Sequence, residues 1–362
     1  MNSKQRVHAA LRRQPVDRIP ICLTFHPDTV SALARLLEVP RQFIADIFDN
    51  DVRIAWVNND YFALGVLHDQ EGEEYTDFWG IRWVRQGSVN RLAEYPLAEM
   101  TPEQVRKFCF PLQHVEELLS RLGPLVSGAY EHFVGCDVSP CVLEMYRRLR
   151  GPDRVEADLE SEPALIEEML DRCAAFAALL AELACRRFPL DWLLVGDAAP
   201  PQDFHSLSPH LWRQRVKPHL QLVFDVARRH RLWIGYRGCG DLRPILPDLI
   251  EMGLDVLQLA ANACPDVDPI DLSREFGEKL AFIGGLPNHV LAHGSTDDVR
   301  RCTRRLIDGM TNRGGGYVLS PSDCMPANTP PENIFALYAE VGLSREEIQD
   351  RAADIRAKHA QR

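Results

Sequence analysis

The sequence predicts an α/β fold, specifically a (β/α)8 TIM barrel, and three observations support this prediction. Short apolar runs alternate with helical patterns through the second half of the chain, as in repeated strand–helix units. The runs are apolar on both faces, which is typical of buried parallel strands. With two earlier runs they give about seven or eight strands, a number that suits a closed barrel. An open doubly wound sheet is the alternative, but no G-x-G-x-x-G follows a strand, so its dinucleotide-binding version has no support.

The individual elements follow from the period of the apolar residues. Strands are expected at the runs 18–25, 130–138, 191–196, 232–236, 255–260, 279–285 and 316–320. Helices are expected at the N-terminus and at 208–230, 241–252, 266–276 and 296–311. The last helix begins at a capping box formed by Ser344 and Glu347, and it is too charged to lie in the core.

The segment 45–100 has a different character from the rest of the chain. It contains "TDFWGIRWVRQGS", is rich in aromatic residues and alternates in polarity, which predicts an inserted strand pair with loops. We find no internal repeat. The prediction is therefore one barrel domain over residues 1–362, with an elaborated part at about 45–100.

The composition of the 362-residue chain is that of a globular protein, with 46% hydrophobic and 26% charged residues. The net charge of −11 argues against non-specific nucleic-acid binding. No apolar run has the length of a membrane span, and the polar N-terminus does not resemble a secretory signal, so we expect a cytoplasmic protein. The ten cysteines include no C-x-x-C pair, and we expect them to be reduced.

In a parallel barrel, function lies at the carboxyl ends of the strands and on the loops that follow them. The candidate side chains at such positions are His26, Asp197, Gln202, Tyr236, Arg237, Cys239, Asn288, Asp323 and Cys324. Asp197 closes an apolar strand, where a carboxylate is costly unless it is paired or used. A helix cap or a loop hydrogen bond is the structural alternative for Asp197, and a turn is the alternative for His26.

A zinc site is one hypothesis for these positions. Cys239 and Cys324 follow different strands and, together with Asp323 or a His, could supply three ligands. Arg237 argues against this hypothesis, because it cannot ligate a metal and its charge beside a divalent cation is unfavourable. A guanidinium is instead suited to holding a carboxylate through two parallel hydrogen bonds.

Several longer segments carry a family resemblance that covers nearly the whole chain. Examples are "RVHAALRRQPVDRIPI", "CGDLRPILPDLIEMGLDVLQ" and "GGGYVLSPSDCMPANTPPENIFALYAEV". The chain resembles the uroporphyrinogen decarboxylase superfamily, which includes cobalamin-dependent methyltransferases. The resemblance implies a distorted (β/α)8 barrel and a homodimer.

The chain departs from both well-known patterns of this superfamily. The methyltransferases bind zinc through a His-x-Cys-Gly strand end and a later Cys, but here the first motif reads "RGCG", with Arg237 at the place of the His. The decarboxylases carry an arginine-rich segment after the first strand, but here that segment is "TFHPDTVSAL". Their catalytic Asp aligns with Asn58 or, after a slip, with Asp60.

Three functions follow as hypotheses. The first is decarboxylation, without a cofactor, of a tetrapyrrole or a smaller carboxylated substrate. Arg237 would hold the carboxylate, and Gln202, Asn288 and Asp323 would bind the substrate with it. Asp197 or Asp60 would donate or accept the proton. Tyr236 and His26 would add hydrogen bonds in a pocket that excludes water. The second is methyl transfer, with zinc on Cys239, Cys324 and Asp323 and a corrinoid protein as partner. The third is a non-catalytic barrel that binds a small acidic ligand.

Overall fold

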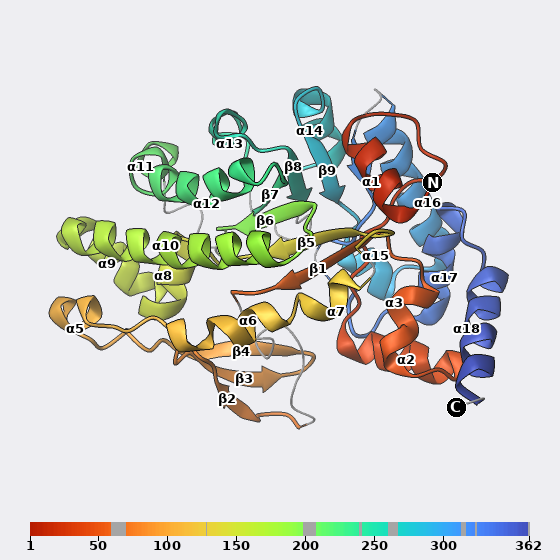
Figure 1. Ribbon diagram of the computed structural model, residues 1–362, viewed down its shortest axis with the longest axis horizontal. Coiled ribbons are helices and arrows are strands. Elements are labelled where there is room, and N and C mark those ends of the chain that lie inside the picture. The colour runs from red at the N-terminus through yellow and green to blue at the C-terminus, as the bar shows by residue number, and fades with distance from the viewer. Residues whose placement is uncertain are drawn as a thin grey trace. The chain divides into compact units, whose positions relative to one another are not determined.

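The computed structural model describes residues 1–58, 70–127, 129–197, 208–238, 241–259, 267–312, 316–322 and 324–360 (Figure 1). Four residues of the predicted site, Asp60, Gln202, Cys239 and Asp323, lie outside these ranges. Their assigned roles stay predictions.

Seven strands form one sheet in the order β1-β5-β6-β7-β8-β9-β10. The pairs β5–β6, β6–β7 and β9–β10 are parallel. From β5 onward each strand lies beside the next strand of the sheet in the chain, without the reversal of order that a doubly wound sheet requires. The strands are Val52–Trp56 (β1), Phe133–Asp137 (β5), Trp192–Gly196 (β6), Trp233–Gly238 (β7), Val256–Leu259 (β8), Ala281–Gly284 (β9) and Tyr317–Val318 (β10).

The predicted first strand, 18–25, is present only as isolated bridges. Ile21 bridges to Leu319 and Phe25 bridges to Met325, both in the parallel sense. The Asp51 carboxylate and the Asn50 amide oxygen accept the backbone N–H groups of Ile21 and Leu23, so side chains replace part of a strand ladder. The structure therefore shows an α/β fold with a seven-stranded sheet, and the closed eight-stranded barrel stays a prediction.

Segment 45–100 differs from the predicted inserted strand pair. Its first strand, β1, belongs to the seven-stranded sheet, and the segment also forms a separate antiparallel sheet, β2-β3-β4. These strands are Glu74–Thr76 (β2), Arg82–Gln86 (β3) and Val89–Glu94 (β4). Trp83 is buried between Tyr75 and Leu92, and its indole N–H donates to Asp77 at 2.8 Å. The alternating polarity of the sequence is explained by this one-sided sheet.

Helices connect the parallel strands. The helix predicted at 296–311 is present with those bounds, whereas the one predicted at 208–230 is two helices, α11 and α12. Pro218 explains the break, because proline has no N–H for the helical ladder.

Within the described ranges no helix combines the length and apolarity needed to cross a membrane. The helices are Ser3–Leu11 (α1), Pro27–Leu37 (α2), Ile44–Ile47 (α3), Pro102–Arg106 (α5), Val115–Ser120 (α6), Gly123–Val126 (α7), Leu143–Arg150 (α8), Pro152–Ser161 (α9), Pro163–Arg187 (α10), Pro209–Arg215 (α11), Lys217–Arg229 (α12), Leu246–Met252 (α13), Pro269–Phe276 (α14), Asn288–His293 (α15), Thr296–Thr311 (α16), Pro331–Glu340 (α17) and Arg345–Ala360 (α18), with 3-10 turns at Arg41–Phe43 (η1) and Leu112–His114 (η2).

The chain divides into two compact units. The first comprises residues 1–53, 130–133 and 258–362, and the second comprises 54–129 and 134–257. The boundary passes through strands β1, β5 and β8. The prediction of one domain over the whole chain is not tested by this division.

A single indole on β6 extends over the two neighbouring strands, β5 and β7. Trp192 on β6 is fully buried, and a Cβ atom added at Gly135 on β5 would lie 1.8 Å from its ring. A Cβ added at Gly235 on β7 would lie 2.9 Å from the same ring. Both neighbouring strands therefore need glycine where the indole crosses them. Helices α10 and α12 run side by side (Figure 1).

Candidate functional site

The carboxyl ends of β5 and β7 bring two opposite charges together. The guanidinium of Arg237 lies 3.0 Å from the carboxylate of Asp137, whose side chain is 0% exposed. The Arg237 side chain is 19% exposed, so the pair meets solvent only through the arginine. The second oxygen of Asp137 accepts the backbone N–H of Ser139 at 2.8 Å. A buried carboxylate needs such compensation, because desolvation of an isolated charge is costly.

Gly196 lies on β6, the strand between those that carry Asp137 and Arg237. In the sheet register, Gly196 lies opposite Arg237, while Asp137 lies opposite Leu194, two residues earlier on β6. Residues two apart on a strand share a face, so all three positions face the same side. A Cβ at residue 196 would lie 2.4 Å from the hydroxyl of Ser139. A side chain there would disturb the turn that holds Asp137.

Trp56 at the end of β1 completes the surroundings of Arg237. The guanidinium carbon lies 5.0 Å from the centroid of the Trp56 ring. This separation is within the range of a cation–π interaction. The arginine is thus fixed by a charge and by a ring, and among the described residues the other N–H donors of its planar group remain available for a ligand carboxylate.

Asp197 lies at the end of β6, and its carboxylate caps a helix. Its two oxygens accept the backbone N–H groups of Val142, Leu143 and Glu144 at 2.8–3.2 Å, at the start of α8. Burial raises the pKa of Asp197 to about 6, against the lowering effect of these three donors. The carboxylate satisfies orphan N–H groups of the helix, which is the structural alternative named above. The catalytic role of Asp197 stays a prediction.

Tyr236 precedes Arg237 on β7 and is fully buried. Its hydroxyl donates to the backbone carbonyl of Asp197 at 3.4 Å. Adjacent residues of a strand point to opposite faces, so Tyr236 and Arg237 do not share a face of the sheet. The structure places Tyr236 in the packing that holds the end of β6, and a role for it in chemistry stays a prediction.

The remaining described candidates belong to the first unit. His26 caps α2, because its ring Nδ1 accepts the backbone N–H of Asp28 at 3.1 Å. Asn288 begins α15, and its amide donates to the backbone carbonyl of Cys324 at 3.1 Å. The structure therefore brings Asn288 and Cys324 together and places His26 at a helix N-cap, and the predicted roles of these residues in the site stay predictions.

Metal ligation is not demonstrated in the described part of the chain. Among those residues, no group of three or more His, Cys, Asp or Glu side chains is placed to hold a metal ion. Of the three predicted zinc ligands only Cys324 is described, as a partly exposed cysteine outside any disulfide. Arg237, at the place of the ligand His, is paired with Asp137. The zinc hypothesis therefore rests on sequence alone.

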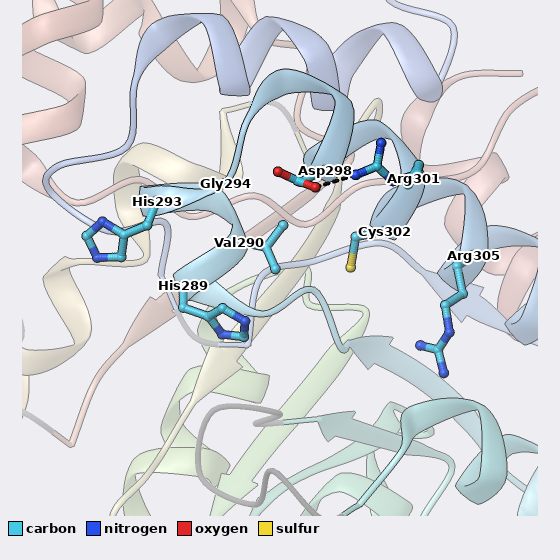
Figure 2. A pocket seen from close by; sticks show the side chains of 8 residues that line it. All are labelled: His289, Val290, His293, Gly294, Asp298, Arg301, Cys302 and Arg305. Carbon is cyan, nitrogen blue, oxygen red and sulfur yellow. Dashed lines mark hydrogen bonds and ion pairs between the residues drawn. The ribbon is translucent and has the colours of Figure 1, made fainter.

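A shallow groove of about 480 Å³ lies between α15 and α16 in the first unit (Figure 2). His289 and His293 lie on its α15 side, and Figure 2 shows their rings pointing in different directions. Arg301 is paired with Asp298, and Arg305 is paired with Asp268. Burial raises the pKa of the Cys302 thiol in the groove. Paired cations and an unactivated thiol do not form a reactive centre.

Comparison with known families agrees with this architecture. The family model described as uroporphyrinogen decarboxylase (URO-D) matches residues 132–342, which is more than half of the chain. The chain belongs to the uroporphyrinogen decarboxylase family. The predicted resemblance is thereby confirmed, and the match includes the segments that carry Asp137, Asp197 and Arg237.

Solved structures support the fold of this URO-D family member. A methyltransferase from Methanosarcina mazei superposes with a TM-score of 0.66 at 18% identity, covering 94% of this chain and 98% of that chain. A 3-keto-L-gulonate-6-phosphate decarboxylase from Vibrio cholerae covers 68% of this chain and 81% of that chain at 12% identity, but its TM-score of 0.32 carries no argument. Comparison with curated protein sequences gives no match.

Sequence reasoning missed Asp137, Trp56 and the spacing role of Gly196. Asp137 is the next-to-last residue of the predicted strand 130–138, so the rule that strand ends carry polar side chains could have found it. Its pairing with Arg237 could not be read, because that requires the register across β6.

Proposed function

We propose that this member of the URO-D family is an enzyme that decarboxylates a carboxylic acid held by Arg237. The observation that carries the proposal is the Arg237–Asp137 pair over the Trp56 ring, at the carboxyl ends of parallel strands. Active sites of parallel barrels are built from these ends. The pair presents a fixed and partly exposed cation, which is the group needed to bind a carboxylate.

The reaction converts R–COO⁻ and one proton into R–H and carbon dioxide. The bond between the carboxyl carbon and its neighbour breaks, its electron pair stays on the substrate carbon, and the proton is added there. Arg237 would fix the orientation of the carboxylate. Asp137 offsets the arginine charge, so the site holds the ground-state carboxylate less tightly than a bare cation would. The ring of Trp56 helps to exclude water.

The proton donor is assigned by sequence to Asp60 or Asp197. Asp197 is the less suitable of the two, because both of its oxygens already accept N–H groups of α8. With a pKa raised to about 6, Asp197 would be largely ionised at neutral pH and would carry a proton only below about pH 6. The substrate is a tetrapyrrole or a smaller acid, and no described contact discriminates the two sizes.

The proposal is tested on Arg237→Lys, which keeps the charge and removes the planar fork. Release of carbon dioxide is measured with uroporphyrinogen and with small carboxylic acids, and binding of the same compounds is measured by calorimetry. We expect kcat/KM to fall about a hundredfold or more, as for a lost charge-assisted contact. The matched control is Arg213→Lys, which changes an arginine paired with Asp248 on the helices. Unchanged turnover in Arg237→Lys would refute the proposal, and binding without any turnover would favour the non-catalytic binder.

Methyl transfer is the second candidate, favoured by the fold likeness to the methyltransferase over 94% of this chain. Zinc would then sit on Cys239, Cys324 and Asp323 and lower the pKa of a substrate thiol, with a corrinoid protein as methyl source. Metal analysis of the purified protein separates the two candidates. Stoichiometric zinc that is lost in both Cys239→Ser and Cys324→Ser would replace the decarboxylase proposal with this one.

A further inference from the structure

Two buried polar atoms lie at the carboxyl end of β1 without a hydrogen-bond partner among the described residues. They are the indole nitrogen of Trp56 and the amide oxygen of Asn58. Asn58 as a whole is only 1% exposed. The amide nitrogen of Asn58 donates to the backbone carbonyl of Pro140 at 2.5 Å. Since a carbonyl only accepts, this contact fixes the amide orientation and leaves the oxygen as the free acceptor.

The two atoms belong to the last residue of β1 and to the bend that follows it. Trp56 and Asn58 are two apart along the chain, and Val57 between them donates its backbone N–H to the carbonyl of Asp137 at 2.8 Å. The Asn58 amide reaches Pro140, three residues after Asp137, and Asp137 is the ion-pair partner of Arg237. Arg237 lies over the Trp56 ring. A cation, an N–H donor and an oxygen acceptor are therefore gathered at one strand end.

A buried donor or acceptor without a partner is costly, and a native structure tolerates it where water or a ligand completes the contact. A carboxylate cannot satisfy both atoms, because it only accepts hydrogen bonds. A hydroxyl satisfies both, since it accepts from the Trp56 N–H and donates to the Asn58 oxygen.

We infer that the substrate is a hydroxycarboxylic acid, with its carboxylate on Arg237 and its hydroxyl between Trp56 and Asn58. This inference rests on the proposed function, because it uses Arg237 as the carboxylate site. Trp56 is then a specificity residue with two separate parts. Its ring positions Arg237, and its N–H donates a hydrogen bond to the substrate hydroxyl.

The two parts can be separated with Trp56→Phe, which keeps a ring beneath Arg237 and deletes the N–H. The probes are malate, as either enantiomer, and succinate, which differ by one hydroxyl, and their affinities are measured by calorimetry. We expect the wild-type protein to bind one enantiomer of malate about tenfold more tightly than succinate, as for two added hydrogen bonds. In Trp56→Phe the two affinities become equal while the succinate affinity stays the same. Asn58→Leu is a second variant with the same expected loss of preference.

The matched control is Trp79→Phe. The indole nitrogen of Trp79 is also buried and unpartnered within the described residues, but it packs against Phe110 and Phe176, where the structure shows no cation over its ring. This variant should keep the preference for malate. Equal binding of malate and succinate to wild type, or a preference that survives in Trp56→Phe, overturns the inference and leaves Arg237 as the carboxylate site. Succinate binding that is absent, or unchanged in Arg237→Lys, refutes the proposed function and this inference with it.

Discussion

The ends of strands β5 and β6 each carry a buried aspartate, and the two are stabilised in different ways. At Asp137 a side-chain cation, Arg237, opposes the charge and keeps donors for a further ligand. At Asp197 three backbone N–H groups of α8 surround the carboxylate and occupy both oxygens. The same residue type at two neighbouring strand ends thus pairs with a cation that can bind a ligand in one case and holds a helix in the other.

The largest expected effect comes from removing the cation beside Asp137. Arg237→Ala leaves a fully buried carboxylate without its counter-charge, so the free energy of unfolding should fall by about 3 to 4 kcal/mol. Asp137→Asn should cost less, about 1 to 2 kcal/mol, because the unpaired arginine can still reach water and the amide oxygen can accept from Ser139. Denaturant unfolding measures both values.

The double variant Asp137→Asn/Arg237→Gln is the control for this asymmetry. It removes both charges and leaves no buried ion, so it should be more stable than Arg237→Ala. Equal losses in the two single variants would show that Asp137 is not isolated from solvent when the arginine is removed.

The second effect is a pH dependence that distinguishes Asp197. Burial raises its pKa from 3.8 to about 6, so between these values the folded chain holds a proton that the unfolded chain has lost. Stability from this group is present below pH 3.8 and is lost as pH rises to about 6, by up to about 3 kcal/mol. Asp197→Asn cannot titrate, so its stability relative to wild type should improve by that amount between pH 4 and pH 7.

Unfolding of both proteins across this pH range measures the difference. A relative stability that does not change with pH would mean that the helix N-terminus keeps Asp197 ionised throughout. In that case the three N–H groups at Asp197 would stabilise a buried carboxylate as well as the positive charge of Arg237 does at Asp137.

The smallest effect concerns the space between the two aspartates. Gly196→Ala places a methyl group 2.4 Å from the Ser139 hydroxyl, which must move, and stability should fall by about 1 to 3 kcal/mol. Gly123→Ala is the matched control, because a Cβ there meets no atom within 4 Å, and its effect should stay within about 0.5 kcal/mol. A tolerated Gly196→Ala, measured by thermal unfolding, would show that the turn at Ser139 adapts freely.

Much of the fold could be predicted from periodicity. Strands β6 to β9 and helix α16 lie where the apolar pattern predicted them. Short continuous apolar runs between turn residues indicate buried strands, and a strong helical period indicates an amphipathic helix. The segment 18–25 failed to form a regular strand because side chains of Asn50 and Asp51 take its N–H groups. Such competition between a side chain and a ladder depends on residues about 30 positions away.

The candidate site could be predicted only in part. The strand-end rule identified Arg237 and Asp197, but their partners lie on other strands, and Asp197 and the α8 N-terminus are 53 to 55 residues apart in the chain. A sequence shows that a carboxylate follows a strand, but it does not show what faces it. The register of β5, β6 and β7 determines which group faces each carboxylate, a helix N-terminus at Asp197 or a counter-charge at Asp137.

The indole of Trp192 has an evolutionary consequence. It occupies the room of three side chains, because Gly135 and Gly235 cannot carry a Cβ while it is present. A mutation that enlarges either glycine is acceptable only after the tryptophan has become smaller, so the order of changes matters. Among descendants of this chain, the three positions should change together, and intermediates that keep the tryptophan beside a larger neighbour should be lost.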